Sequence, residues 1–434
     1  MRIRLILTFG KNPLPVLVAA RRLCEHFHAL PDLLIIPLYS TNSGDEYRLV
    51  RIELNSVVGR ELVWDETAQP ILPGNPESIS AAIGRVPPGD LYHLHYTGGT
   101  KVMAVHTMEA LSRRAEAERA HFEATYLDPN EHMVVGWKMR SPLAHVSDER
   151  KEWALSPDVL ARLHGMYLPR PSTDATPYEQ PAKALWTVVL KQSEFLTVYE
   201  RWKDNWRAKF ENKGGSRAPG RTHWPTDPIP WLMLDDPEWE RVTAMLKSKF
   251  CPEAWTATGI EASRFETQRG LQPWWGFVAG GKDLEAYALA ELKAALPAEC
   301  NGSAVFGFKA IAPGASQECD IDVAAVLGYQ FLAISCTTAA SRDHCKQKGF
   351  EVWLRARQIG GDTARAILLC PNYHPQPDES DEGLEADLNK DIGARGDTGE
   401  SVRMVRVWHT KTMPWGSRLR DKFKEYFKED LRWT

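Results

Sequence analysis

The sequence predicts an α/β protein in which two sheet-containing domains are joined by a connector. Two observations carry this prediction: apolar strands alternate with amphipathic helices in the first third of the chain, and a similar pattern returns in the last third. The length of 434 residues allows two or three domains. We place the domains at residues 1–146 and 274–434, with a connector over 147–273.

The first domain alternates short buried strands with helices that keep an apolar face. Such alternation predicts a mostly parallel sheet with helices on both faces. Pro13 and Pro15 stand at the start of the first helix, where proline is tolerated. The expected strands are Arg2–Leu7, Leu33–Leu38, Leu91–His95 and His121–Leu127, and the expected helices are Leu14–Phe27 and a second one that ends near Ala120.

The connector is irregular and rich in proline and tryptophan. It contains one long expected helix, Leu185–Lys209, and is either a separate linker or part of the third segment. In that third segment we expect helices at Asp283–Ala295 and Arg342–Gln358 and strands at Ala304–Ile311, Asp320–Leu327, Gln330–Cys336, Ala364–Leu369 and Val402–His409. An acidic loop at Pro377–Lys390 and a charged tail helix complete this prediction.

Composition excludes several classes of protein. The chain is 43% apolar and 25% charged, and it contains no run of roughly 20 apolar residues that would cross a membrane. Its seven cysteines form no CxxC pair, which argues against a disulfide framework or a zinc site and favours the cytoplasm. Because the net charge is −4, any contact with nucleic acid must use local basic patches.

A glycine-rich turn is the sharpest local motif. Thr97, Gly98, Gly99, Thr100 and Lys101 stand between a strand and a helix, where glycines allow close approach of a ligand and free helix amides favour an anion. Hydroxyl groups and the lysine also suit phosphate. The spacing is neither that of a P-loop nor that of a dinucleotide-binding turn. The motif is therefore either a phosphate site or a simple helix cap.

A second turn follows the first strand, at Thr8, Phe9, Gly10, Lys11 and Asn12. Two strand-to-helix turns on one edge of an open sheet face the same crevice, which is where ligands of such sheets bind. Lys11 is either a second phosphate contact or an exposed loop lysine.

These two turns resemble those of the CRISPR-associated Rossmann-fold (CARF) sensor domain, over about the first 145 residues. The resemblance implies a homodimer that binds a cyclic oligoadenylate, cyclic tetra-adenylate in particular, across its two-fold axis. Both turns would then contact the ligand. His95 precedes the glycine-rich turn and is either a ligand contact or, like His93, a hydrogen-bonded core residue.

Carboxylates mark a second candidate site. Glu285 lies on an expected helix, and Glu318, Asp320 and Asp322 begin an expected strand, on which Asp320 and Asp322 share one face. Such clusters bind the hard divalent cations that assist phosphodiester hydrolysis. Acidic residues that only mark the start of a strand are the alternative.

The order of elements around these acids resembles the PD-(D/E)xK nuclease core of CRISPR ancillary nucleases of the Card/Can type, over residues 280–369. The resemblance implies Mn²⁺ or Mg²⁺ bound by Glu285 and Asp322, with Asp320 also in the catalytic site. The expected Glu-x-Lys motif is replaced by Ser335, Cys336 and Thr337. Either a lysine comes from elsewhere or the domain only binds. The candidate lysines are Lys346 and Lys348, with Glu351 beyond them, and Lys309, which is either a third candidate or an exposed strand lysine.

A basic and aromatic stretch is the candidate for nucleic-acid contact. Residues Arg201–Arg221 carry seven basic and two acidic residues, together with Trp202, Trp206 and Phe210. Basic groups follow phosphates and aromatic rings stack on bases, but a spacing of four residues equally predicts a buried helical stripe. The basic tail Arg403–Arg432 is expected to be a solvated helix face.

Together the two resemblances imply a cyclic oligoadenylate-activated, metal-dependent nuclease of type III CRISPR defence, with DNA or RNA as substrate. A sensor whose degenerate nuclease domain binds only nucleic acid or a protein is the alternative. The sequence leaves open whether the first domain also cleaves its own ligand.

Overall fold

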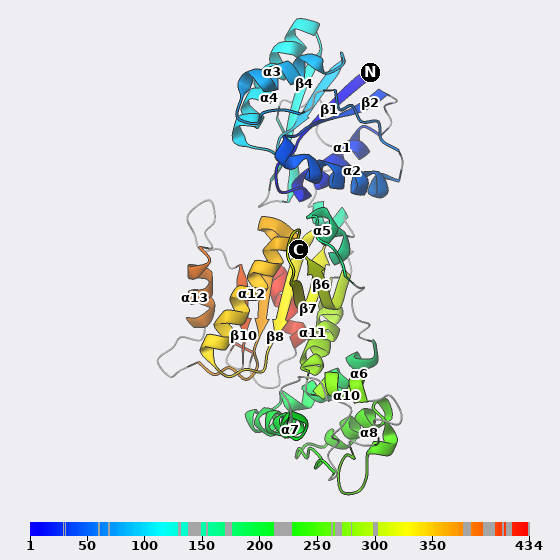
Figure 1. Ribbon diagram of the computed structural model, residues 1–434, viewed down its shortest axis with the longest axis vertical. Coiled ribbons are helices and arrows are strands. Elements are labelled where there is room, and N and C mark those ends of the chain that lie inside the picture. The colour runs from blue at the N-terminus through cyan, green and yellow to red at the C-terminus, as the bar shows by residue number, and fades with distance from the viewer. Residues whose placement is uncertain are drawn as a thin grey trace.

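The computed structural model shows two five-stranded sheets, one in each of the two predicted sheet-containing regions. Figure 1 shows them one above the other along the long axis, with the helices between residues 176 and 249 beyond the second sheet. The predicted α/β class is confirmed. The structure describes all residues except 29, 31, 60, 68–69, 129–131, 138–148, 153–154, 170–175, 212–227, 262–263, 265–270, 279, 298–302, 376–382, 394–403, 410–411, 414–418 and 433–434.

The first sheet has the order β2-β1-β3-β4-β5, and its first four strands are parallel. Strand β5 is antiparallel to β4 and was not predicted. The strands are β1 (Arg2–Thr8), β2 (Asp32–Leu38), β3 (Leu91–His95), β4 (His121–Asp128) and β5 (Met133–Trp137). Their bounds agree with the four predicted strands to within one residue, because each is a short apolar run bounded by polar or turn residues.

Helices cover both faces of this sheet. Leu5 and Leu7 of β1 pack with α1 and α2, whereas Ile6, on the opposite face, packs with α3 and α4. The helices are α1 (Leu14–His26), α2 (Gly44–Val58), α3 (Pro76–Arg85) and α4 (Lys101–Glu118), with a 3₁₀ turn at Thr41–Ser43. Helices α2 and α3 were not predicted. The parallel, two-sided arrangement places both candidate ligand turns at the carboxyl edge of the sheet.

The second sheet is mixed and has the order β10-β9-β8-β7-β6. Strands β6, β7 and β8 pair antiparallel, and β8, β9 and β10 pair parallel. Their bounds are β6 (Ser303–Ile311), β7 (Glu318–Leu327), β8 (Gln330–Cys336), β9 (Arg365–Leu369) and β10 (Val405–Trp408).

Each face of the second sheet has its own helices. On β8, Leu332 and Ile334 pack toward α11 and α14, whereas Phe331 and Ala333 pack toward α5, α12 and α13. The helices are α5 (Pro157–Leu163), α11 (Lys282–Ala295), α12 (Arg342–Gly360), α13 (Gly383–Asp391) and α14 (Leu419–Glu429), with 3₁₀ turns at Glu149–Glu152 and Gly361–Thr363.

The predicted loop at Pro377–Lys390 was wrong in its second half, because α13 begins at Gly383. Leu384 and Leu388 are buried there, four residues apart, and form the apolar face of this helix. The acidic side chains around them hid this face in the sequence. The first half of the predicted loop lies outside the described residues.

The connector consists of helices that share a core with α11 and α14. The predicted single helix Leu185–Lys209 was wrong: it is two helices, separated at Leu190–Gln192. The Lys191 amine, in the break, pairs with Asp236 at 2.8 Å. The connector helices are α6 (Thr176–Val189), α7 (Ser193–Glu211), α8 (Trp239–Lys249) and α10 (Leu271–Val278), with a 3₁₀ turn at Pro252–Ala254.

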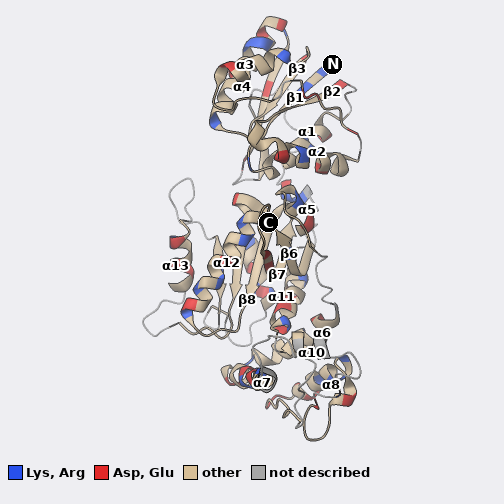
Figure 2. Ribbon diagram, in the orientation of Figure 1, with Lys and Arg blue, Asp and Glu red and all other residues tan. Residues whose placement is uncertain are grey.

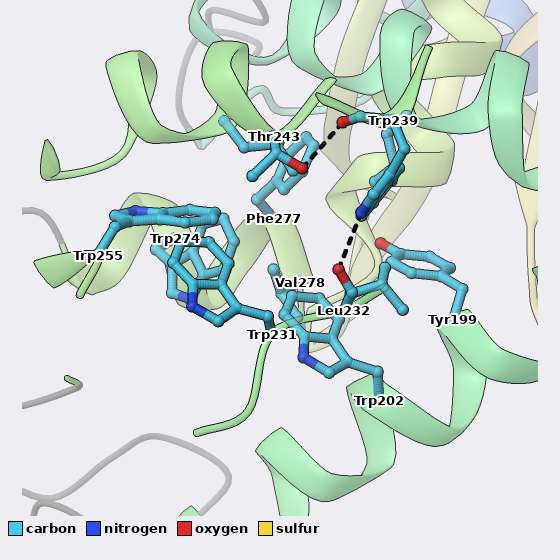
Figure 3. Close-up of a pocket in the computed structure, with 12 residues that line it drawn as sticks. Tyr199, Trp202, Trp231, Leu232, Trp239, Thr243, Trp255, Trp274, Phe277 and Val278 are labelled. Carbon is cyan, nitrogen blue, oxygen red and sulfur yellow. Dashed lines mark hydrogen bonds between the residues drawn. The ribbon is translucent and has the colours of Figure 1, made fainter. Parts of the chain in front are cut away.

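The tryptophans of the connector form a packed aromatic core, shown in Figure 3. Trp202 and Trp206 are buried and meet Trp274 edge to face, with ring centroids 6.1 and 5.6 Å apart. The cavity among these rings measures about 10 Å³, which leaves room for about one water molecule. Trp239 donates from Nε1 to the Leu232 carbonyl at 2.9 Å. The buried-stripe interpretation of Trp202 and Trp206 is confirmed; the side chain of Phe210 lies outside the described residues.

Helix α5 joins the first domain to the second sheet. Arg162 at its end lies 3.4 Å from Glu53 of α2, and Tyr167, just after it, pairs with Ile311 of β6. A second junction lies at the end of α12, where a side chain added at Gly361 would meet the Asn12 amide at 3.0 Å. The second candidate ligand turn therefore lies against the helix that flanks the candidate nuclease site.

Within the described part of the chain, no helix combines the length and the apolar character that crossing a membrane requires.

Candidate ligand site and candidate nuclease site

The two predicted ligand turns pack directly against each other at the edge of the first sheet. A Cβ atom on Gly10 would lie 2.9 Å from the Gly99 amide nitrogen, and one on Gly98 would lie 2.0 Å from the Thr8 carbonyl oxygen. Gly99 has a φ of 80°, a conformation that favours glycine. The Thr8 hydroxyl donates to the Gly98 carbonyl. Glycine is thus required at these positions by close backbone approach.

Side chains of the glycine-rich turn divide into structural and exposed groups. Thr100 caps α4, because its Oγ1 accepts from the Met103 amide at 3.1 Å. Thr97 Oγ1 accepts from the Leu127 amide at 2.6 Å, which ties the turn to β4. Lys101 is the first residue of α4 and is exposed. Of these three, only Lys101 presents a free charged group beside the helix N-terminus.

The first turn offers mainly its backbone. The side chains of Thr8 and Phe9 are buried in the core, so a ligand would meet only their main-chain atoms. Lys11 is 73% exposed, but its amine lies 2.9 Å from Glu46 on α2. Asn12 Oδ1 accepts from the Leu14 amide at 3.3 Å and so orients the start of α1.

Both histidines of β3 belong to the core. His93 Nε2 and His95 Nδ1 lie 3.0 and 3.2 Å from the Thr125 hydroxyl, and both rings are fully buried. Burial lowers the pKa of His95 to about 3, so its ring is neutral at physiological pH. This agrees with the core interpretation of these two residues.

The structure brings Glu285, Asp320 and Asp322 together at the predicted nuclease site. Burial, followed by the charges of Asp322 and Asp320, raises the pKa of Glu285 well above its ordinary value. Burial also raises the pKa of Asp322. A carboxyl whose pKa is raised by the charges of neighbouring carboxylates lies close to them and is repelled by them when ionised.

Strand β8 supplies hydrogen bonds where the resembled family has an acid and a lysine. Asp322 Oδ2 accepts from the Cys336 amide at 2.6 Å and from the Ser335 hydroxyl at 3.1 Å. Both contacts lower the pKa of Asp322 and partly oppose the effect of burial. Burial together with the charges of Asp322 and Glu285 raises the pKa of the Cys336 thiol well above its usual range, so this thiol is not a nucleophile at neutral pH.

The candidate lysines differ in their position. The Lys346 amine lies 2.7 Å from Asp391 on α13 and so is engaged outside the carboxylate cluster. Lys348 lowers the pKa of Asp322 by its charge and also lies 3.1 Å from Glu351. Lys309 on β6 lies 3.0 Å from both Asp320 and Glu318. Of the three candidate lysines, Lys348 and Lys309 are therefore the two that interact with the predicted site.

A buried charged network beside this site was not predicted. Asp283 of α11 accepts from Trp186 at 3.0 Å and from the Tyr199 hydroxyl at 2.6 Å. Lys203 of α7, which is fully buried, lies 2.9 Å from Glu200 and 3.7 Å from Asp283. Asp283 lies 84 positions from Tyr199 and 97 from Trp186 along the chain, so only the fold brings them together. Asp283 also raises the pKa of Glu285, so the network reaches the candidate site.

The carboxylates of the candidate nuclease site have the chemistry that a divalent cation prefers, but they are not arranged as a complete metal site. Glu285 and Asp322 supply hard carboxylate oxygens whose mutual repulsion a cation would relieve. The described residues contain no group of three or more His, Cys, Asp or Glu side chains arranged to hold a metal ion. Glu285 and Asp322 are the two groups that the resemblance assigns to such an ion, and water or substrate would have to complete the shell.

Figure 2 shows Lys and Arg interspersed with Asp and Glu along the described part of the chain. This distribution agrees with a net charge of −4. The predicted basic stretch Arg201–Arg221 lies partly on α7, and its remainder, from residue 212 onward, lies outside the described residues.

Comparison with known proteins supports the overall fold. No protein-family model matches the chain, and no curated protein matches its sequence. Protein VC1899 from Vibrio cholerae aligns with a TM-score of 0.60 at 13% identity, over 98% of each chain. Can2 from Sulfobacillus thermosulfidooxidans, solved in complex with cyclic tetra-adenylate, aligns with a TM-score of 0.59 at 12% identity, over 98% of this chain and 96% of its own. The chain therefore shares its whole fold, from the first sheet through the connector to the second, with these two structures.

Proposed function

We propose that the protein is a sensor of cyclic oligoadenylate in type III CRISPR defence. The observation that carries this proposal is the direct packing of two glycine turns, Gly10 on Gly99, at the N-terminus of α4. The exposed Lys101 begins α4 beside these turns, at a helix N-terminus, where an anionic ligand is favoured. Can2, which shares the whole fold, was solved with cyclic tetra-adenylate, and this molecule is the ligand we propose.

The proposed binding unit is a homodimer, because a ring with rotational symmetry suits a two-fold interface. The outer face of α4 is a candidate for this interface. Val102 and Val105 on this face are 42% and 61% exposed, and a hollow lined by Tyr96, Met108 and other α4 residues lies beside them. Exposed apolar side chains grouped beside a ligand turn are suited to contact with a second copy.

The response we propose is metal-dependent cleavage of a nucleic acid by the second sheet domain. Glu285 and Asp322 would hold Mn²⁺ or Mg²⁺, which when bound supplies an activated water and stabilises charge on the phosphate. Ser335 and the Cys336 amide fix the orientation of Asp322. Lys348, and Lys309 across Asp320, would supply the positive charge that β8 lacks.

A contact between the two domains offers a path for activation. Asn12, in the ligand turn, lies against Gly361 at the end of α12. The same helix carries Lys348 beside Asp322, and Arg355 donates to the Asp320 carbonyl. A shift of the ligand turn would thus reach the carboxylate cluster through one rigid helix. Such coupling requires that the ligand binds the active arrangement more tightly than the inactive one.

One observation favours a second candidate function, a sensor without catalysis. Asp322 Oδ2 already accepts two hydrogen bonds, and the family lysine of β8 is absent. In this alternative the second sheet domain only binds nucleic acid or a protein.

Calorimetric titration of the protein with cyclic tetra-adenylate tests the sensor assignment. We expect Lys101→Ala to bind the ring at least about tenfold more weakly, because a charge-assisted hydrogen bond contributes about 1.5–3 kcal/mol. Lys249→Ala, which removes an exposed lysine of α8, is the matched control and should bind as the parent does. Equal affinity in both variants, or no binding in the parent, would overturn the assignment.

A further inference from the structure

A recess of about 680 Å³ lies outside both candidate sites. It is formed by the connector helices α6 and α8 together with α11 and α14. Its volume falls within the range of about 300–1,000 Å³ that is typical of small-molecule sites. Neither glycine turn contributes to it, and it contains none of Glu285, Asp320 and Asp322.

The charges that line this recess do not cancel. Two lysines of its wall are already paired: Lys183 lies 3.2 Å from Glu291, and Lys191 lies 2.8 Å from Asp236 and 3.3 Å from Glu238. These contacts also account for both carboxylates of the lining. Within the lining, the two lysines balance the two glutamates, so the positive charges of the two arginines remain.

Two arginines line the same recess and are less closely paired than these lysines. Arg241 of α8 is exposed and forms no ion pair or hydrogen bond within the described part of the chain. Arg420 of α14 forms only a long ion pair, in which its Nε lies 3.9 Å from Asp421 Oδ1, and this Nε has no hydrogen-bond partner. Because the Arg420 side chain remains 32% exposed, a ligand in the recess can offer an acceptor to its guanidinium group.

The remaining lining is mixed in character. Ala184, Leu190 and Met245 offer apolar surface, and Gln180 and Thr187 offer an amide and a hydroxyl. A ligand that suits this lining has a flat or apolar part, polar edges and a compact anionic group. Guanidinium pairs bind phosphate with two parallel hydrogen bonds each, and a phosphate monoester carries a charge of about −1.5 to −2 at neutral pH.

We propose that this recess binds a phosphorylated nucleotide unit, with Arg241 and Arg420 on the phosphate and the apolar wall against the base. The unit is either a free nucleotide or the phosphorylated end of a nucleic-acid strand. This inference goes beyond the proposed function, because it uses neither the cyclic oligoadenylate turns nor the carboxylate cluster.

Fluorescence-polarisation titrations without metal test the proposal. The probes are a labelled adenosine monophosphate, a labelled pentanucleotide with a free terminal phosphate, and the same pentanucleotide without it. We expect the phosphorylated probes to bind and Arg241→Ala and Arg420→Ala each to weaken binding by about tenfold or more. Lys249→Ala, on the same helix as Arg241 but outside the recess, should leave the affinity unchanged.

The outcomes separate the two sources and the two proposals. Preference for the mononucleotide identifies a free nucleotide, and preference for the phosphorylated pentanucleotide identifies a strand end. Equal affinity for the pentanucleotides with and without the terminal phosphate would overturn the proposal. So would an unchanged affinity in both Arg241→Ala and Arg420→Ala. Because Lys101→Ala and Asp322→Ala should leave this binding intact, failure of the proposed sensor or nuclease function would not affect the result.

Discussion

The Ser335 hydroxyl donates to Asp322 Oδ2 at 3.1 Å, beside the Cys336 amide, which donates to the same oxygen at 2.6 Å. A neutral side chain on β8 thus does part of what a cation would do, because it stabilises the charged form of Asp322. Burial acts in the opposite direction and raises the pKa of this carboxyl. The balance between these effects determines the pH at which Asp322 ionises.

Removal of the Ser335 hydroxyl should therefore raise the pKa of Asp322 further. We expect the pH profile of Mn²⁺ binding by Ser335→Ala to move to higher pH than that of the parent, because the metal needs the ionised carboxylate. Ser335→Thr keeps the hydroxyl and should restore the parent profile. Electron paramagnetic resonance of free Mn²⁺ over a pH series measures this shift. An unchanged profile in Ser335→Ala would show that Asp322 does not hold the ion.

The raised pKa of Glu285 predicts how the free energy of unfolding depends on pH. Its folded-state pKa is raised, so its ionisation opposes folding once the pH exceeds the unfolded-state value of about 4.3. This destabilisation is absent below that pH and complete above the raised pKa. In EDTA, Glu285→Gln should thus be more stable than the parent at neutral pH, with the difference closing on acidification. Denaturant unfolding at pH 4 and pH 7.5 checks this; a variant less stable at both values contradicts it.

The packing of the two ligand turns predicts a large effect of one methyl group. In Gly98→Ala the new Cβ would lie 2.0 Å from the Thr8 carbonyl and 2.5 Å from a Val16 methyl, so the turn must move. We expect a loss of stability of about 1–3 kcal/mol, as for other overpacked sites, and loss of ring binding. Gly84→Ala in α3, where a Cβ meets no atom within 4 Å, is the control. It should gain about 0.5–1 kcal/mol through helix propensity.

The contact between Asn12 and Gly361 predicts a variant that separates binding from response. In Gly361→Ala the Cβ would lie 3.0 Å from the Asn12 amide, and the residue has a φ of 66°. We expect ring binding to persist within about threefold while ligand-activated cleavage falls by at least about tenfold, the size of a typical coupling energy. Gly393→Ala has a similar φ of 67° but meets no atom within 4 Å, so it reports backbone strain alone. Parallel losses in both variants would assign the effect to strain.

Periodicity predicted most of the two sheets because their strands are short apolar runs between turns. Strand β3 and strand β8 have the bounds that the sequence predicts. The errors arose where packing on a distant element decides the structure. Helix α13 depends on Leu384 and Leu388 facing α12, and the break between α6 and α7 depends on Asp236 reaching Lys191.

The candidate sites show the same division. Residues within one turn, such as Gly98 and Gly99, could be identified from their order along the chain. The network of Lys203, Glu200 and Asp283 could not, because α7 and α11 are brought together only by the fold. Lys346 pairs with Asp391, whereas Lys348 lies near Asp322. The sequence could not distinguish these two lysines, because their partners depend on how α12 packs.

The most direct test of the account is cleavage of labelled single-stranded DNA, single-stranded RNA and supercoiled plasmid in Mn²⁺, with and without cyclic tetra-adenylate. The account predicts cleavage only when the ring is present, and loss of that cleavage in Asp322→Ala with ring binding retained. No cleavage of any substrate by protein that is shown to bind both the ring and Mn²⁺ would contradict the nuclease assignment and favour a sensor that acts by binding alone.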